Sequence, residues 1–217
     1  MSEAMADGLR EGARDLGLDL TEEAQRQLLA YMALIQKWTR VYNLTAVRDP
    51  QEMLTHHLLD SLSALPPLLR HTAGQPVRLL DVGSGGGLPG VVLAICRPEI
   101  QVSCVDTVGK KAAFIQQVAA TLRLPNLRGL HARVETVQET YDVVCSRAFA
   151  SLADFTSWSV SALAEEGVWM AMKGKMPTDE IAQLPPVIEV FHVEQLTVPG
   201  LDAERCMLWL RPHRQSL

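Results

Sequence analysis

The strongest restriction on the fold comes from a glycine-rich turn that directly follows an apolar run. Residues 79–90 read LLDVGSGGGLPG, so the run passes through Asp81 and five glycines follow within residues 83–90. Glycines at this density after a buried strand let the backbone approach a ligand closely. In an open parallel sheet, ligands bind beyond the carboxyl ends of the strands. The turn therefore predicts an α/β protein with a ligand site at this point.

Seven short apolar runs predict the strands of one sheet. They cover residues 77–82, 101–106, 127–132, 141–148, 167–174, 188–194 and 205–211. Helical patterns at about 88–97 and 109–123 separate the first three runs, which is typical of β-α-β units in a parallel sheet. Only a loop separates the last two runs, so these must pair antiparallel. We therefore expect a doubly wound, mostly parallel sheet with an antiparallel C-terminal strand and a helical N-terminal extension.

Residues 1–71 are predicted to form a helical N-terminal cap, and residues 72–217 are predicted to form the sheet domain. We expect the two parts to make one structural unit. Thr21 is the expected N-cap of a long helix. A second helix is predicted to begin after Asp49, with a proline in its first turn, and to end at Pro66–Pro67. The apolar residues at helical spacing in the long helix are Leu28, Met32, Ile35 and Val41.

Composition and chain ends limit the class of protein. The 20 basic and 25 acidic residues give a net charge of −5, which argues against coating nucleic acid by charge alone but does not exclude local basic patches. The N-terminus lacks the basic start of a signal peptide, and no run of about 18 apolar residues occurs, so we expect a cytoplasmic protein. Four widely spaced cysteines in apolar segments are expected to be core residues, namely Cys96, Cys104, Cys145 and Cys206.

Two nucleoside cofactors compete for the glycine turn. Residues 85–90 satisfy G-x-G-x-x-G, but a bare match to this dinucleotide motif is weak evidence. Counting from Gly83 places Leu88 where close helix packing needs glycine. We interpret Asp81 as a fixed negative charge that faces the turn, repels pyrophosphate and attracts the cationic S-adenosylmethionine. Asp106, at the end of the second strand, is expected to accept ribose hydroxyls of either cofactor.

Five sequence blocks, taken in order, carry a resemblance to one family. They are YNLTAVRDPQEML (42–54), LLDVGSGGGLPG (79–90), VDTVGKKAAFIQQVA (105–119), CSRAFASL (145–152) and MKGKMP (172–177). With these blocks the chain resembles the bacterial 16S ribosomal RNA guanine-N7 methyltransferases of the small subunit, also called glucose-inhibited division protein B. The likeness covers nearly the whole chain, whereas the glycine turn alone would indicate only a methyltransferase.

The resemblance implies a Rossmann-like class I methyltransferase that moves a methyl group from S-adenosylmethionine to N7 of a guanine in the decoding-centre loop of 16S rRNA, leaving S-adenosylhomocysteine. Because guanine N7 carries a lone pair and no proton, placement suffices and no general base or metal is expected. Arg147 is the predicted catalytic residue, which clamps the cofactor's carboxylate or stacks on a flipped base. The alternative is a structural ion pair with an acid such as Asp142 or Glu135. The expected cofactor-binding residues are Gly83, Gly85, Leu88, Asp106, Val134, Glu135 and Arg147.

RNA contact is expected from local patches, and the partner implied by the resemblance is 16S rRNA within the 30S subunit or an assembly intermediate. The expected RNA-binding residues are Asn43, Thr45, Arg48, Lys110, Lys111, Lys173 and Lys175. Binding through phosphates would depend strongly on salt. His56 stands where the family usually has a basic residue, which puts a phosphate contact there in doubt. Adjacent His56 and His57 point in different directions and form no expected metal site, and a monomer is expected.

Two other functions stay in competition at this stage. The match at residues 85–90 leaves a NAD-dependent oxidoreductase, which would bind NAD and not S-adenosylhomocysteine. A non-enzymatic ribosome-assembly module would keep the fold and bind RNA, although it would have no reason to retain the intact turn with Asp81 and Asp106.

Overall fold

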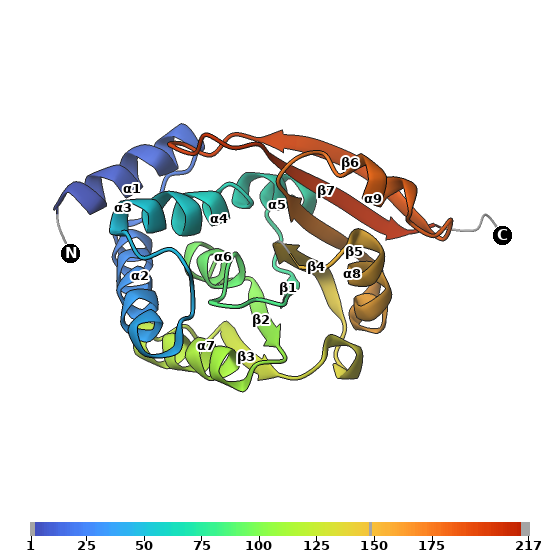
Figure 1. Ribbon diagram of the computed structural model, residues 1–217, viewed down its shortest axis with the longest axis horizontal. Coiled ribbons are helices and arrows are strands. Elements are labelled where there is room, and N and C mark those ends of the chain that lie inside the picture. Colours follow the sequence, from blue (N-terminus) through green and yellow to red (C-terminus); the bar gives the residue numbers. More distant parts are fainter. Residues whose placement is uncertain (1–2, 148, 214–217) are drawn as a thin grey trace.

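One seven-stranded sheet runs through the computed structural model, which describes residues 3–147 and 149–213 (Figure 1). The strands lie in the order β3-β2-β1-β4-β5-β7-β6. They are β1 (Arg78–Val82), β2 (Gln101–Asp106), β3 (Leu127–His131), β4 (Tyr141–Arg147), β5 (Leu163–Lys173), β6 (Ile188–Leu196) and β7 (Arg205–Pro212). Strand β7 pairs antiparallel with both β5 and β6, and the pairs β3-β2, β2-β1, β1-β4 and β4-β5 are parallel. The predicted fold class and all seven predicted strands are confirmed.

The order of the strands places a switch point beside β1. The chain winds from β1 through α6 (Gly90–Cys96) to β2 and through α7 (Gly109–Leu122) to β3, and then returns to β4 on the other side of β1. The two predicted crossover helices are thus confirmed. Because ligands in doubly wound sheets bind at such a point, the carboxyl ends of β1, β2 and β4 are where a site is expected.

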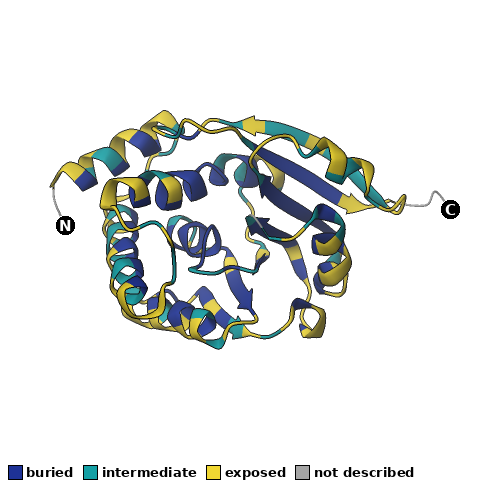
Figure 2. Ribbon diagram, in the orientation of Figure 1, coloured by how far each residue is buried: buried dark blue, intermediate teal, exposed yellow. Residues whose placement is uncertain are grey.

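Helices cover the two faces of the sheet unequally. The N-terminal helices pack with α6 and α7 on one face, where the apolar cluster includes Leu79, Val102 and Val143. The other face carries Leu80, Val105 and their neighbours, and it packs against the short elements of the chain's second half. These elements are η2 (Val134–Thr136), α8 (Leu152–Ser159), η3 (Val160–Ala162) and α9 (Thr178–Ala182). Alternate residues of each strand therefore enter two different clusters, as the pleat requires, and Figure 2 shows the central strands buried between the layers.

The N-terminal region consists of α1 (Glu3–Asp15), α2 (Glu22–Tyr42) and a nearly continuous helical path from Pro50 to Thr72. The path comprises α3 (Pro50–Met53), the π-helical η1 (Leu54–Leu59), α4 (Asp60–Leu62) and α5 (Leu65–Thr72). The predicted N-cap Thr21 is confirmed, because it accepts from the Ala24 amide at 3.1 Å. The predicted helix start after Asp49 is also confirmed, and Asp49 caps this helix by accepting from the Gln51 amide at 2.9 Å.

Two expectations for this region are wrong. The helix does not end at Pro66–Pro67, because both prolines lie in the first turn of α5, where no backbone N–H is required. Leu28, Met32 and Ile35 of α2 are buried as expected, but Val41 is 70 % exposed.

The expectation that the cysteines are core residues is confirmed for Cys104, Cys145 and Cys206, which are fully buried, whereas Cys96 is half-buried. Within the described part of the chain, no helix combines the length and the apolar character that crossing a membrane would require.

Candidate functional site

The glycine turn at the end of β1 folds back over the neighbouring strand. The amides of Gly83 and Ser84 both donate to the carbonyl of Val105, at 2.9 and 3.2 Å. Gly83 and Gly85 have φ angles of +65° and +57°, a region that favours glycine. A Cβ on Gly83 would lie 2.3 Å from the ring of Phe149, whereas a Cβ on Gly85 would have nothing within 4 Å. Gly85 therefore faces open space, which leaves its backbone accessible to a ligand.

Asp106 joins the glycine turn to the start of α7. Its Oδ2 accepts from the Gly85 amide at 3.0 Å, its Oδ1 accepts from the Val108 amide at 2.9 Å, and Lys111 Nζ lies 3.7 Å from Oδ2. The side chain is only 7 % exposed, so the carboxylate is held in one orientation. Since a carboxylate offers about four lone-pair positions, it can accept further hydrogen bonds from a ligand.

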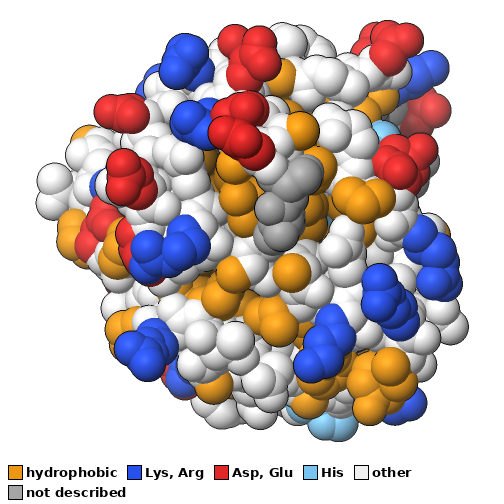
Figure 3. Space-filling view, turned by 90° about the vertical axis from the view of Figure 1, so that its left-hand side faces the viewer, with side chains coloured by type: hydrophobic (Ala, Val, Ile, Leu, Met, Phe, Trp, Pro, Cys, Tyr) orange, Lys and Arg blue, Asp and Glu red, His pale blue; other side chains and the backbone are white. Residues whose placement is uncertain are grey.

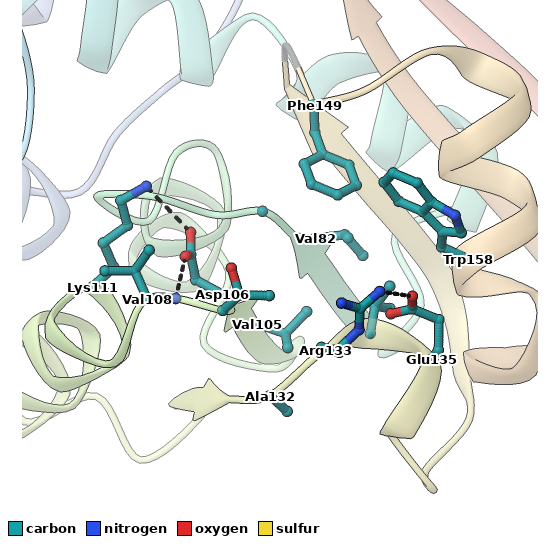
Figure 4. Close-up of a pocket in the computed structure, with 13 residues that line it drawn as sticks. Val82, Val105, Asp106, Val108, Lys111, Ala132, Arg133, Glu135, Phe149 and Trp158 are labelled. Atoms are coloured by element: carbon teal, nitrogen blue, oxygen red, sulfur yellow. Dashed lines mark hydrogen bonds and ion pairs between the residues drawn. The ribbon is translucent and has the colours of Figure 1, made fainter.

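The larger of two cavities at this edge has a volume of about 380 Å³ and opens beside Asp106 (Figure 4). Figure 4 shows Asp106 and Lys111 on one side and Phe149 and Trp158 on the opposite side. The wall comes from the ends of β1 and β2, the segments that follow β3 and β4, and the helices α7 and α8. It consists of Val82, Gly83, Val105–Val108, Lys111, Ala132–Glu135, Phe149 and Trp158. A cavity with apolar walls and a few convergent polar groups is typical of a small-molecule site.

A smaller cavity of about 200 Å³ lies on the other side of Gly83, between the glycine turn and the N-terminal helices. Its walls are Ile35, Leu44, Thr45, His57, Gly83–Gly86, Leu88 and Arg147. Two buried polar atoms among these walls, Ser84 Oγ and His57 Nδ1, have no hydrogen-bond partner within the described residues. Unpaired buried polar atoms are rare, and a ligand with polar groups would satisfy them. His57 Nε2 lies 3.0 Å from Thr45 Oγ1, and burial lowers the pKa of His57, so the ring is neutral at pH 7.

Arg147 reaches the smaller cavity from the end of β4. Its Nη1 donates to Asp60 Oδ2 at 2.8 Å and to the carbonyl of His56 at 2.9 Å. The same carboxylate accepts from Arg205 Nε of β7 at 2.8 Å on its other oxygen. The Asp60 side chain is 3 % exposed, so one buried carboxylate joins the N-terminal helices to two strands. Arg147 is therefore fixed by an acid that no site prediction included.

The ion pair considered as the alternative role of Arg147 therefore exists, with Asp60 as the acid. The two acids named as examples of such a partner are engaged elsewhere. Asp142 accepts from the Arg78 amide at 2.8 Å, and Glu135 pairs with Arg133 at 2.8 Å. The hydrogen bond from Arg133 lowers the pKa of Glu135, which stays ionised at the wall of the larger cavity. Val134 and Glu135 both line this cavity, as do Gly83 and Asp106, whereas Gly85, Leu88 and Arg147 line the smaller one.

The prediction that Asp81 presents a fixed negative charge to the turn is wrong. Asp81 is fully buried beneath the turn and lines neither cavity. Its Oδ2 accepts from the Gly90 amide at 2.8 Å and so holds the start of α6. Burial, opposed by this hydrogen bond and by the charge of Arg147, raises the pKa of Asp81 to about 7. The carboxyl group is therefore a structural support and cannot repel a phosphate by a full charge.

This raised pKa predicts a pH dependence of stability. An acid with a higher pKa in the folded protein binds its proton more tightly there, so its contribution to stability falls as pH rises from its ordinary value of 3.8 towards about 7. The slope is at most about 1.4 kcal/mol per pH unit. Asp81→Asn should remove this slope, because the amide oxygen still accepts from Gly90 without a charge. Urea unfolding of both proteins between pH 4.5 and 7.5 measures the difference, and parallel curves would contradict the assignment.

The predicted RNA-binding residues fall into two groups. In the first group Thr45 lines the smaller cavity and Lys111 the larger one. Asn43 Oδ1 accepts from Arg48 at 2.8 Å, and Lys110 lies 5.0 Å from the centre of the Tyr42 ring.

The second group lies at the end of β5 and in the loop after it, with Lys173 as the last residue of the strand and Lys175 beyond it. Lys173 donates to Glu180 at 2.9 Å and to the carbonyl of Ala150 at 3.0 Å, and its side chain is 13 % exposed. Its charge is thus already paired, whereas Lys175 is exposed. Within the described residues no group of three or more His, Cys, Asp or Glu is arranged to hold a metal ion.

The residues of the two cavities or their support that the sequence analysis did not assign to the site include His57, Asp60, Phe149 and Trp158. An acid inside an apolar helical run, as at Asp60, was the one available signal, because such an acid needs a partner.

Comparison with known proteins gives consistent matches. A family model described as rRNA small subunit methyltransferase G matches residues 24–208. The chain is 71 % identical over 212 residues to ribosomal RNA small subunit methyltransferase G of Acidovorax sp. (strain JS42), which covers 94 % of each chain. It is 59 % identical over 216 residues to the protein of the same description from Methylibium petroleiphilum, covering 99 % of this chain and 97 % of the relative.

Solved structures share the fold at much lower identity. Magnesium protoporphyrin IX methyltransferase of Synechocystis PCC 6803 with bound SAM superposes with a TM-score of 0.59 at 13 % identity, over 83 % of this chain and 97 % of the other. TrmN of Thermus thermophilus gives a TM-score of 0.56 at 18 % identity, over 74 % of this chain and 53 % of the TrmN chain. At this level of sequence identity, these structures show only that the chain shares their fold.

Proposed function

Because the chain belongs to the family of rRNA small subunit methyltransferase G, we propose that it transfers a methyl group from S-adenosylmethionine to N7 of a guanine in the decoding-centre loop of 16S rRNA. The observation that carries the proposal is the pair of cavities on either side of Gly83, one beside Asp106 and one beside Arg147. An elongated cofactor with a nucleoside at one end and a charged amino-acid tail at the other matches this arrangement.

The residues of the two cavities fit S-adenosylmethionine. Asp106 would accept the ribose hydroxyls, and the backbone of Val134 with Glu135 would border the adenine in the larger cavity. Arg147 would pair with the carboxylate of the tail in the smaller cavity, where Ser84 Oγ lies buried without a partner among the described residues. The open space above Gly85 supports this assignment, since a side chain there would stand in the way of the ligand.

The methyl transfer requires the protein mainly to position the two reacting groups. When bound, S-adenosylmethionine supplies an activated methyl group, and guanine N7 supplies a lone pair without a proton to remove. The chain therefore needs no general base, and alignment of the reacting groups accounts for roughly 7–11 kcal/mol of barrier lowering in well-oriented reactions. Arg147 serves this purpose by holding the cofactor, because Asp60 already fixes its guanidinium group.

The two competing functions are not supported. The relatives that cover nearly the whole chain are described as methyltransferases, not oxidoreductases, and Leu88 interrupts the dinucleotide motif where glycine is needed. A module without catalysis has no support from these relatives either.

We retain the 30S subunit or an assembly intermediate as substrate, a cytoplasmic location and a monomeric state as parts of the proposal.

Gly85→Ala should separate cofactor binding from folding. The Cβ would project into open space beside the proposed cofactor path, and the φ of +57° costs about 1 kcal/mol for alanine. We expect S-adenosylhomocysteine affinity to fall at least about tenfold, the cost of overfilling a fitted site. Calorimetric titration measures it. Gly17→Ala is the matched control, because Gly17 also has a positive φ of +72° and nothing within 4 Å, away from both cavities. Equal affinities for both variants would contradict the proposed path.

The proposed activity is tested by methyl transfer from labelled S-adenosylmethionine. The substrates are mature 30S subunits, partly assembled subunits and deproteinised 16S rRNA, each followed by mapping of the modified nucleotide. Label at the N7 position of one guanine in 16S rRNA is the expected result, and it should vanish with Asp106→Ala. Absence of label at any guanine N7 across all three substrates would reject the proposal.

A further inference from the structure

A small apolar surface lies exposed at the end of α2. Val41 is 70 % exposed, Tyr42 is 46 % exposed, and Val108, which precedes α7, is 43 % exposed. Lys110 Nζ lies 5.0 Å from the centre of the Tyr42 ring, so the two segments meet at this point. We call Val41, Tyr42, Val108 and Lys110 the Tyr42 patch. Large apolar side chains gathered on a surface and bordered by charge are typical of an interaction site.

The Tyr42 ring is supported from below by the core. The centre of the Trp38 ring lies 5.1 Å from that of Tyr42, and Trp38 meets the buried Phe114 edge-on at 5.2 Å. Asn43 then ends the helix in a left-handed conformation, and its amide donates to the Thr39 carbonyl at 3.0 Å. The ring is thus preorganised, which lowers the entropic cost of binding against it.

The patch borders the larger cavity and is close in sequence to a wall residue of the smaller one. Val108 also lines the larger cavity, and Leu44, two residues after Tyr42, lines the smaller one. Val108 thus puts the patch at the rim of the cavity in which the nucleoside of the cofactor is proposed to lie. The position of the patch therefore suits a segment adjoining the target nucleotide.

The surroundings of the patch are basic although the whole chain is acidic. Lys110 and Lys111 open α7, and Arg40 and Arg48 line a groove of about 400 Å³ between the end of α2 and the following loop. Figure 3, which views the side of the N-terminal helices, shows basic side chains beside hydrophobic ones in its lower right part, whereas acidic side chains lie mainly in the upper half. This charge favours a polyanion over a protein partner of mixed charge.

We propose that the Tyr42 patch is a stacking platform for an unpaired base of ribosomal RNA next to the target guanine, with Lys110, Arg40 and Arg48 on the adjoining phosphates. The proposal rests on the proposed function for the identity of the RNA. An exposed aromatic ring flanked by cations is the arrangement with which proteins hold single-stranded nucleic acid. The contact of Lys110 with the ring is weak at an exposed position, so an incoming base can displace it.

Replacing the ring tests the platform. Tyr42→Ala should weaken binding to 30S subunits about 5- to 150-fold, the range for loss of one stacked base, and Tyr42→Phe should stay within about twofold because it keeps the ring. Both variants should bind S-adenosylhomocysteine as the wild type does. Val187→Ala is the matched control, because Val187 is 59 % exposed at a distance from the site along the chain, before β6. Ultraviolet crosslinking of the bound complex should join the Tyr42 peptide to a nucleotide.

The possible failures are distinguishable. If Tyr42→Ala binds subunits as tightly as the wild type, and the wild type methylates guanine N7, the platform is overturned and the proposed function stands. If Tyr42→Ala loses subunit binding, but the wild type methylates nothing, the platform is supported and the proposed function is rejected. A crosslink of the Tyr42 peptide to a ribosomal protein, or an equal loss of S-adenosylhomocysteine affinity in Tyr42→Ala, would overturn the platform.

Discussion

Asp106→Ala is expected to weaken S-adenosylhomocysteine binding by about 100-fold or more. Two hydrogen bonds from ribose hydroxyls to a carboxylate contribute about 1.5–3 kcal/mol each, and the structure adds a second cause. The carboxylate also accepts from the amides of Gly85 and Val108, so its removal frees the turn that the cofactor contacts. Calorimetric titration of the variant against the wild type measures the loss.

Asp106→Asn provides the control for this prediction. Asparagine keeps one acceptor oxygen but has an NH₂ group in place of the other. This NH₂ group would face the backbone amide of Gly85 or Val108, and two donors cannot form a hydrogen bond with each other. We expect an intermediate affinity and a small change in thermal stability. If Asp106→Ala bound the cofactor within a factor of three of the wild type, the ribose would have to lie elsewhere.

Asp60→Ala is expected to destabilise the fold by about 3 kcal/mol, towards the lower end of the range for breaking a buried ion pair. Asp60 is 3 % exposed and accepts from Arg147 and Arg205, whose side chains are only 20 % and 23 % exposed, so both guanidinium groups would lose their partner away from full solvent. Methyl transfer should fall as well, because Arg147 would no longer be held at the smaller cavity. Urea unfolding and the transfer assay measure the two effects.

Glu139→Ala is the matched control for Asp60→Ala. Glu139 also pairs with two arginines, Arg78 and Arg128, but it is 48 % exposed, and ion pairs at that exposure contribute about 0–1 kcal/mol. It lines neither of the two cavities, so activity should be unchanged. A loss of stability in Asp60→Ala no greater than in Glu139→Ala would contradict the account of Asp60.

Local patterns were sufficient to predict the fold. The strands followed from short apolar runs with helical patterns between them, and the helix starts at Thr21 and Asp49 followed from capping chemistry, which depends on residues within three positions. The error at Pro66–Pro67 arose because a proline pair fits the first turn of a new helix as well as it ends an old one.

The site was predicted in part, and the errors share a cause. The turn glycines, Asp106 and Val134 were placed at the cavities by their position at strand ends. Asp81 also ends a strand, but whether its side chain points under or over the turn depends on packing that the sequence does not contain. The partnership of Asp60 with Arg147 spans 87 positions, and that with Arg205 spans 145. Depth of burial and distant partners are set by the tertiary fold.

The central claim is that S-adenosylmethionine lies across Gly83, with its nucleoside beside Asp106 and its tail beside Arg147. A crystal structure of the protein with S-adenosylhomocysteine tests it most directly. We expect both ribose hydroxyls within hydrogen-bonding distance of the Asp106 carboxylate and the tail carboxylate within reach of Arg147. A nucleoside bound in another cavity, or a tail that points away from Arg147, would contradict it.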